Sequence, residues 1–242
     1  MKSIGGFFGA AGLAAALTLS GPAVSAPIYS IGVGSSGTRF ALYFDTASPG
    51  LSAFANVSVY NATATQLVLN FAITNDTAVS EAGPLTQASL MSLGLDFDLN
   101  PTGANLSVSG SSFDGLTTSV SNFPGDFTID VCVFAANNCQ GGDIKDGLLV
   151  QDLVGTDKDI LSPAGDTFRL ILSRSSSTNA WSLNTAAVKF QTNLGSFEFA
   201  GCTTENQCTT STTHVPEPGS IALVGGVAIA FALTGWRRRR GR

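Results

Sequence analysis

The stretch that decides the fold is Leu93-Gly94-Leu95-Asp96-Phe97-Asp98-Leu99-Asn100, in which every second residue is large and apolar. A period of two places the apolar residues on one face of an extended strand and the remaining residues on the other. Other segments repeat this alternation with the apolar residues Phe40, Leu42 and Phe44; Leu67, Leu69, Phe71 and Ile73; Phe127, Ile129, Val131 and Val133; Phe168, Leu170 and Leu172; and Phe197 and Phe199. The sequence therefore predicts many half-buried strands.

Short clusters of Gly, Pro, Asn, Asp and Ser separate these segments, as in Ser48-Pro49-Gly50 and Asn100-Pro101-Thr102-Gly103. Such clusters favour turns. Many strands that each have one apolar face commonly pack as two stacked antiparallel sheets. We therefore expect an all-β fold, a single antiparallel β-sandwich of the jelly-roll or immunoglobulin-like kind, over residues 27–202. One exception is residues 146–153, where three leucines favour a short helix.

The N-terminus has the pattern of a secretory signal peptide over residues 1–26. Lys2 precedes a mostly apolar run of roughly 16 residues, and small residues follow up to Ala26. A membrane anchor is the alternative, but this run is shorter than the 20 or so residues that a span prefers. Because Pro27 would obstruct a peptidase, cleavage after Ser25 or Ala23 is also open.

The C-terminus combines a proline-containing segment, an apolar stretch and an arginine cluster. Residues 220–236 are uncharged and mostly apolar, and Arg237, Arg238, Arg239 and Arg240 follow directly. As a helix this stretch would be roughly 24 to 26 Å long, enough for a thin bilayer. Arginines beside a span stay in the cytoplasm, so we expect one transmembrane helix with the body outside. An amphipathic surface helix is the alternative, but the stretch has no polar face.

The net charge of −5 averages over unlike parts of the chain. Residues 27–215 hold 6 of the 12 basic and 16 of the 17 acidic residues, which gives this body a charge of about −10. Such a body repels nucleic acid and anionic membranes, so we expect no nucleic-acid partner. Cations, basic proteins and neutral glycans fit its charge better. Between body and tail, residues 203–214 are rich in Thr and Ser and are expected to form a linker.

The four cysteines form two close pairs along the chain, Cys132 with Cys139 and Cys202 with Cys208. In an exported chain, an even number of cysteines in local pairs favours disulfides, and we expect the sequential connectivity. Each bond would close a short loop and stabilise the fold by roughly 2 to 3 kcal/mol in the chain-entropy description. Zinc is the alternative, but its sites favour tighter spacing such as C-x2-C and usually include histidine, and neither is present here.

The residue sets of common catalytic sites are missing, so we expect neither enzymatic activity nor a cofactor. The single histidine, His214, lies beside the tail, which leaves a nucleophile without a base. Paired carboxylates are the remaining candidates for acid and base chemistry. These are Asp96, Asp98, Asp126 and Asp130, and the alternation puts all of them on polar strand faces, where they serve solubility.

Five aspartates gather in a loop-rich stretch: Asp143, Asp146, Asp152, Asp157 and Asp159. Calcium binds carboxylates of this kind, but their spacing follows no known calcium loop. The run from Asp96 to Asn100 likewise lacks the glycine and distal glutamate of such a loop. We predict no metal site, and calcium at the aspartate-rich stretch stays the alternative to solvated charge.

Read together, Val215-Pro216-Glu217-Pro218-Gly219-Ser220, the apolar stretch and the arginine cluster closely resemble the sorting signal of PEP-CTERM proteins, the exosortase substrates of Gram-negative bacteria. The likeness covers about 28 residues, in the order and spacing of that family. It implies that Val215, Pro216, Glu217 and Pro218 are the processing motif and that an exosortase is a partner. It also implies an inner-membrane precursor, held by its helix and stopped by its arginines, followed by delivery to the cell surface or secretion.

The proline geometry agrees with this resemblance. Two prolines one residue apart exclude a helix and keep the segment extended, which suits a protease-like cleft. The alternative is a plain helix start, with Pro218 at the beginning of the span.

Two functions from different classes fit these features. The first is a structural or adhesive role at the surface or in the extracellular matrix. The alternative is a glycan-binding module with extracellular polysaccharide as a partner. Glycan binding requires exposed aromatic side chains that stack on sugar rings. Besides phenylalanine, the body offers Tyr29, Tyr43, Tyr60 and Trp181.

Overall fold

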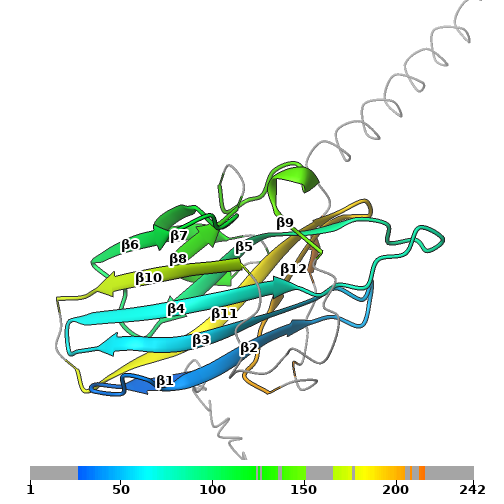
Figure 1. Ribbon diagram of the computed structural model, residues 1–242. Coiled ribbons are helices and arrows are strands. Elements are labelled where there is room, and N and C mark those ends of the chain that lie inside the picture. The colour runs from blue at the N-terminus through cyan, green and yellow to red at the C-terminus, as the bar shows by residue number, and fades with distance from the viewer. Residues whose placement is uncertain are drawn as a thin grey trace, which may run out of the picture.

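The computed structural model describes residues 27–123, 125, 127–135, 138–150, 166–175, 178–204, 208 and 213–215 (Figure 1). The predicted signal peptide and the predicted transmembrane helix lie outside these ranges. Within them every regular element is a strand, apart from one short 3-10 helix. The expectation of an all-β body is therefore confirmed.

Two antiparallel sheets make up the described body. The smaller sheet has the strand order β2 (Arg39–Asp45), β3 (Ser52–Ala62), β4 (Gln66–Asn75), β10 (Asp166–Ser173) and β6 (Gly103–Val108). The larger sheet has the order β13 (Thr213–Val215), β12 (Gly195–Ala200), β11 (Ala180–Thr192), β5 (Ala88–Phe97), β8 (Phe127–Phe134) and β7 (Gly115–Phe123). Two short strands complete the larger sheet, β1 (Tyr29–Gly32) against β11 and β9 (Leu148–Leu149) against β5.

One apolar core joins the two sheets, which lie one behind the other in Figure 1. The alternating segments supply it from both sides. Leu93 and Leu95 of β5 and Leu170 and Leu172 of β10 are each at most 1% exposed. The inward faces of these strands were thus predicted correctly. On β8 the prediction holds for Val131 and Val133 only, because Ile129 belongs to a second cluster and Phe127 packs against that cluster. The choice between a jelly-roll and an immunoglobulin-like type stays a prediction.

The larger sheet is also buried on its outer face, which the alternation did not predict. A second apolar cluster lies there, made of Phe123, Ile129, Cys132, Cys139 and Ala187. Gly94 pairs with Cys132 and with Ala187 on this face, and a side chain at Gly94 would meet Ile129 Cδ1 at 2.9 Å. Asp130 is only 6% exposed. The assignment of Gly94 and Asp130 to a solvated polar face was wrong because residues of β7, β8 and the loop after β8 cover it.

Residues 146–153 do not begin with the predicted helix. The 3-10 helix η1 covers Ile144–Asp146, and the next two leucines form β9 against β5. Leu148 is buried in the core, and its carbonyl accepts a hydrogen bond from Asn75 Nδ2 over 3.0 Å. Sheet pairing and burial of one leucine therefore outweigh the local helix signal, and the third leucine of the segment lies outside the described residues.

The two sheets are connected along one side by Tyr43 of β2 and Cys202, which follows β12. The Tyr43 N–H donates to the Cys202 carbonyl over 2.8 Å, and the Cys202 N–H donates back over 3.0 Å. Further along the chain, β13 pairs with β12, with Val215 opposite Ser196. The segment 203–214, expected to be a linker, thus ends in a strand at the edge of the larger sheet.

Candidate functional site

One row of polar side chains crosses the outer face of the smaller sheet. The antiparallel register places Arg39, Ser58, Asn70, Arg169 and Ser107 opposite one another on β2, β3, β4, β10 and β6. Along β3, β4 and β10 the flanking residues belong to the core, so this row faces outward. Because neighbouring strands lie about 4.8 Å apart, the row is about 19 Å long. It extends from one edge of the sheet to the other.

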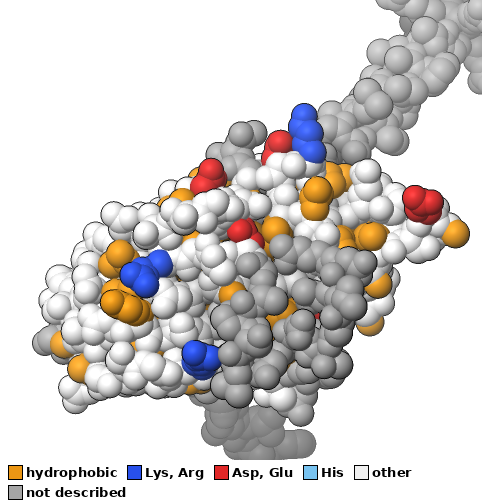
Figure 2. Space-filling view, viewed as in Figure 1, with side chains coloured by type: hydrophobic (Ala, Val, Ile, Leu, Met, Phe, Trp, Pro, Cys, Tyr) orange, Lys and Arg blue, Asp and Glu red, His pale blue; other side chains and the backbone are white. Residues whose placement is uncertain are grey.

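This polar row lies in a groove formed by two adjoining hollows. Their volumes are about 450 and about 620 Å³, and both have Arg39, Ser58 and Asn70 in their walls. The other polar groups of the walls are mostly amides and hydroxyls, from Asn56, Ser109 and Thr167 in the first hollow and Ser36, Asn61 and Gln66 in the second. Figure 2 shows this face, where basic side chains lie over the strands of the smaller sheet.

Arg169 is held by two neighbours within the groove. Its guanidinium carbon lies 4.2 Å from the centre of the Tyr60 ring, and its Nε donates a hydrogen bond to Asn70 Oδ1 over 2.7 Å. Asn70 Nδ2 lies 3.5 Å from Ser58 Oγ. Tyr60 is 57% exposed. Among the described residues the two Nη groups of Arg169 have no hydrogen-bond acceptor, so they are available to a ligand.

The charged side chains in the described walls of the groove are basic, whereas the body has a net negative charge. Arg39 and Arg169 line it, and the described part of its walls contains no acidic side chain. The nearby Asp166 is engaged elsewhere, since its Oδ2 accepts hydrogen bonds from the N–H groups of Ser112 and Phe113 over 2.7 and 3.1 Å. The described walls of the groove are therefore basic, although residues 27–215 as a whole carry net negative charge.

The four aromatic candidates for sugar stacking differ in how much of each side chain is exposed to solvent. Trp181 is 0% exposed, and its Nε1 donates to the Thr63 carbonyl over 2.9 Å, so it is a core residue and not a sugar platform. Tyr29 stacks on Phe40 with ring centres 3.9 Å apart. Tyr43 is half-buried. Only Tyr60, among these four, presents most of its side chain to solvent.

The strand carboxylates show how burial changes acidity. Asp130 Oδ2 accepts a hydrogen bond from the Phe97 N–H over 2.8 Å. Burial raises the pKa of Asp130; the Phe97 hydrogen bond partly opposes this shift, and the charge of Asp98 adds to it. Burial also raises the pKa of Asp96, with a further contribution from the charge of Asp130. Asp130 is therefore not the solubilising surface residue that was expected, and Asp126 lies outside the described residues.

The aspartate-rich stretch is only partly described. Asp143 precedes η1 and Asp146 is its last residue. Asp143 Oδ2 lies 3.6 Å from Lys145 Nζ in an exposed ion pair. Asp152, Asp157 and Asp159 lie outside the described residues. In the part of the chain that the structure covers, no group of three or more His, Cys, Asp or Glu side chains could hold a metal ion.

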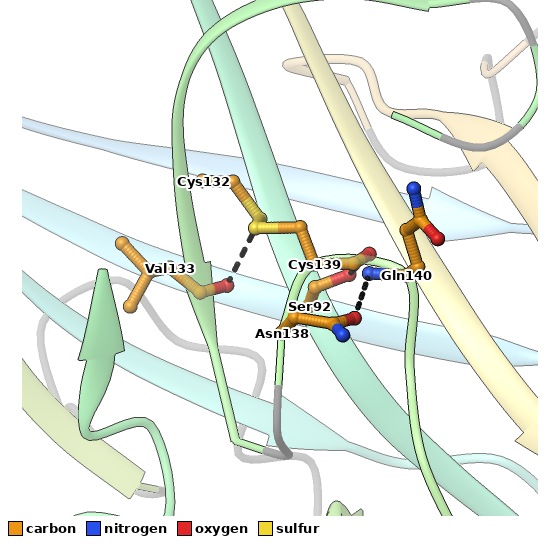
Figure 3. The surroundings of a disulfide bond; sticks show 6 residues. All are labelled: Ser92, Cys132, Val133, Asn138, Cys139 and Gln140. Carbon is orange, nitrogen blue, oxygen red and sulfur yellow. Dashed lines mark hydrogen bonds between the residues drawn. A yellow bond between two sulfur atoms is a disulfide. The ribbon is translucent and has the colours of Figure 1, made fainter. Parts of the chain in front are cut away.

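Both predicted disulfides are present, Cys132–Cys139 and Cys202–Cys208. Figure 3 shows the first, which closes the loop after β8, with Ser92 beside it. Ser92 Oγ donates a hydrogen bond to the Cys139 carbonyl over 3.1 Å. This bond ties the disulfide loop to β5 on the outer face of the larger sheet.

Beside that loop lies a buried ion pair that the sequence did not indicate. Lys189 of β11 and Glu198 of β12 are register partners, and their side chains are 7% and 0% exposed. A Cβ at Gly141, just after the disulfide loop, would lie 2.7 Å from Lys189 Cε. The chain after Cys139 thus packs directly on the lysine.

The sorting motif begins where the described body ends. Val215 is the last residue of β13, whereas Pro216, Glu217, Pro218 and Arg237–Arg240 lie outside the described residues. Within the ranges given above, no helix has the length and apolar character that membrane crossing requires. The predicted helix over 220–236 is outside those ranges.

Sequence comparison identifies the C-terminal tail as a known sorting motif. Residues 214–240 match the family model of the PEP-CTERM protein-sorting motif. No curated protein and no solved structure is significantly similar to the chain. The match covers the proline-containing segment, the apolar stretch and the arginine cluster together. This chain therefore carries a PEP-CTERM protein-sorting motif at its C-terminus and is an exported protein that depends on an exosortase.

Proposed function

We propose that this protein is a non-catalytic component of the cell surface or extracellular matrix with a structural or adhesive role. The sorting motif at residues 214–240 carries the proposal, because its task is to deliver the attached body to the outside. Two disulfides within an all-β body suit an oxidising extracellular setting. The absence of a histidine from residues 27–213 supports a role without acid and base catalysis.

The proposed route follows from the two ends of the chain. The signal peptide over residues 1–26 starts export, and the helix over 220–236 holds the precursor in the inner membrane. Arg237–Arg240 keep its end in the cytoplasm, as arginines beside a span do. The exosortase then cuts at the extended Val215–Pro218 segment, which its two prolines keep out of a helix.

Processing tests this route directly. Replacing Pro216, Glu217 and Pro218 with alanine in the full-length chain should leave membrane insertion intact and abolish trimming. An immunoblot of membrane and medium fractions reads both, and a host without its exosortase should give the same retained form. The matched control is a triple alanine replacement of Thr210, Ser211 and Thr212, which should be trimmed normally. If the variant without Pro216, Glu217 and Pro218 is trimmed normally, the tail is only a membrane anchor and the proposed processing motif is wrong.

A second candidate function, glycan binding, is favoured by the groove on the smaller sheet. It combines a row of amide, hydroxyl and guanidinium groups with the exposed ring of Tyr60. A glycan array with the full-length chain in detergent separates the two candidates. Binding that is lost in Tyr60→Ala favours the glycan module, whereas no binding to any glycan leaves the structural role.

A further inference from the structure

We propose that the groove on the smaller sheet binds a carboxylated polysaccharide and that Arg169 pairs with a sugar carboxylate. This inference rests on the glycan-binding candidate and narrows it to acidic glycans. The net charge of the body, about −10, disfavours acidic ligands and by itself would favour neutral partners. The argument for an acidic ligand therefore depends on the local arrangement around Arg169.

The first step is the preorganisation of the guanidinium. Tyr60 lies against its face at 4.2 Å, and Asn70 accepts its Nε–H over 2.7 Å. These two contacts fix the plane of the Arg169 side chain before any ligand arrives, which removes much of the entropy loss of binding. Its two Nη groups can then donate the parallel pair of hydrogen bonds that matches the two oxygens of a carboxylate.

The second step is the chemistry of the rest of the row. Ser58, Asn70 and Ser107 share the row with the two arginines, so hydroxyl and amide groups lie between and beside the cationic ones. Hydroxyls and amides both donate and accept hydrogen bonds, as sugar hydroxyls do. A row about 19 Å long can follow several units of an extended polysaccharide chain. The exposed part of the Tyr60 ring adds an apolar surface for a sugar face.

The third step is discrimination by charge. Within the described residues the walls of the groove have no acidic side chain, while most of the remaining charge of the body is negative. An acidic polymer is therefore repelled from the body in general and accepted at this face. Repulsion elsewhere gives specificity for one docking position, because misplaced complexes are disfavoured.

Binding of the full-length chain in detergent to a linear oligogalacturonate tests the proposal, with its methyl ester and a neutral dextran as comparison ligands. We expect the free carboxylate form to bind at least about tenfold more tightly than the ester, the difference that one charge-assisted pair provides. Arg169→Gln should lose about the same factor, and Arg169→Lys should lose part of it because a lysine lacks the planar fork. Dextran sulfate reports whether any anionic polymer suffices.

Two further variants control for charge and folding. Lys145→Gln removes one exposed cation that is not part of the groove walls and should bind as the wild type does. Ser107→Asp, directly opposite Arg169 on the edge strand β6, adds a competing carboxylate without removing a buried group and should weaken binding at least as much as Arg169→Gln does. The arginine tail is common to all variants, so its contribution cancels.

Each outcome decides a different point. Equal affinity for oligogalacturonate, its ester and dextran would refute the acidic class and leave a neutral glycan module. Equal losses in Arg169→Gln and Lys145→Gln, or unchanged binding in Ser107→Asp, would overturn the assignment of the site. Tighter binding of dextran sulfate than oligogalacturonate would replace the carboxylate with sulfate. No binding to any glycan would refute this inference and the glycan module together, while processing at the sorting motif would stand.

Discussion

Lys189 Nζ lies 2.9 Å from Glu198 Oε1 across the β11–β12 pair, and both side chains are buried. A buried charge is stabilised mainly by its ion-pair partner, because water cannot solvate either side chain. Lys189→Met should therefore lower the free energy of unfolding by about 3 to 5 kcal/mol. The combined change with Glu198→Leu should recover most of this loss, since no buried charge remains. Urea denaturation of the full-length chain in detergent measures both.

The exposed pair Lys145 and Asp143 is the matched control for this prediction. Their atoms lie 3.6 Å apart, but the side chains are 78% and 77% exposed. Lys145→Met should change the free energy of unfolding by less than about 1 kcal/mol. A similar loss at both sites would mean that burial of Lys189 and Glu198 has no energetic effect.

The Cys132–Cys139 disulfide covers a buried apolar cluster, whereas Cys202–Cys208 closes a loop of similar length near the surface. In the chain-entropy description each bond contributes about 2 kcal/mol. Replacing Cys132 and Cys139 with alanine should cost more than this, because Cys132 is fully buried and its loop would also detach from Ser92. Non-reducing urea titrations compare the two double variants. A larger loss for the Cys202 and Cys208 variant would contradict the prediction.

The raised pKa values of Asp96 and Asp130 predict a specific pH dependence. In the folded chain both carboxyls hold their protons to a higher pH than the ordinary value of 3.8. The folded state binds more protons, so their contribution to stability is greatest below about pH 4 and is lost as the pH rises through the raised values. Asp130→Asn keeps an acceptor for the Phe97 N–H and removes this loss.

Unfolding curves of wild type and Asp130→Asn between about pH 4 and pH 7 check this prediction. The charge of Asp130 also raises the pKa of Asp96, so the variant reduces the loss at both carboxyls and the two effects on the free-energy difference have the same sign. We expect that difference to move in favour of the variant as the pH rises. A difference that is independent of pH, or that moves towards the wild type, would refute the shift.

Trp181 and Tyr60 should behave oppositely when truncated. Trp181 is fully buried and stacks with the Arg174 guanidinium at 3.9 Å, so Trp181→Ala should cost about 3 to 5 kcal/mol of stability. Tyr60→Ala should cost less than about 1 kcal/mol, because the ring is mostly exposed. Urea midpoints separate the two. A stability loss at Tyr60 as large as that at Trp181 would disqualify Tyr60 variants as tests of glycan binding.

The alternation of Leu93, Leu95 and Phe97 predicted the inward face of β5 because a strand shows only two faces and one of them was plainly apolar. The same pattern failed at Asp130, and it gave no sign that Lys189 and Glu198 are buried. Alternation says that these side chains leave the main core, but it does not say what the rest of the chain places over them. The disulfide loop and the β7–β8 pair cover that second face, and such coverage depends on tertiary structure.

The groove was hidden from the sequence for a related reason. Arg39 and Arg169 are distant in the chain and become members of one row only through the register of three strand pairs. No local pattern specifies that register. Tyr60 was identified as an aromatic candidate, but the sequence did not show that Trp181, another candidate, is buried. The disulfides, by contrast, join near neighbours, so their spacing was sufficient.

The contact between Tyr43 and Cys202 has a mechanical consequence. Any pull on the C-terminal segment passes along β13 to Cys208 and then through a covalent bond to Cys202, bypassing residues 203–207. At Cys202 the load divides between β12 of one sheet and, through two backbone hydrogen bonds, β2 of the other. Tension at the tail is thus shared by both layers instead of peeling one strand away. A body held by its C-terminal end should therefore resist mechanical unfolding. In optical-tweezer extension, the unfolding force should be lower once Cys202 and Cys208 are replaced with alanine.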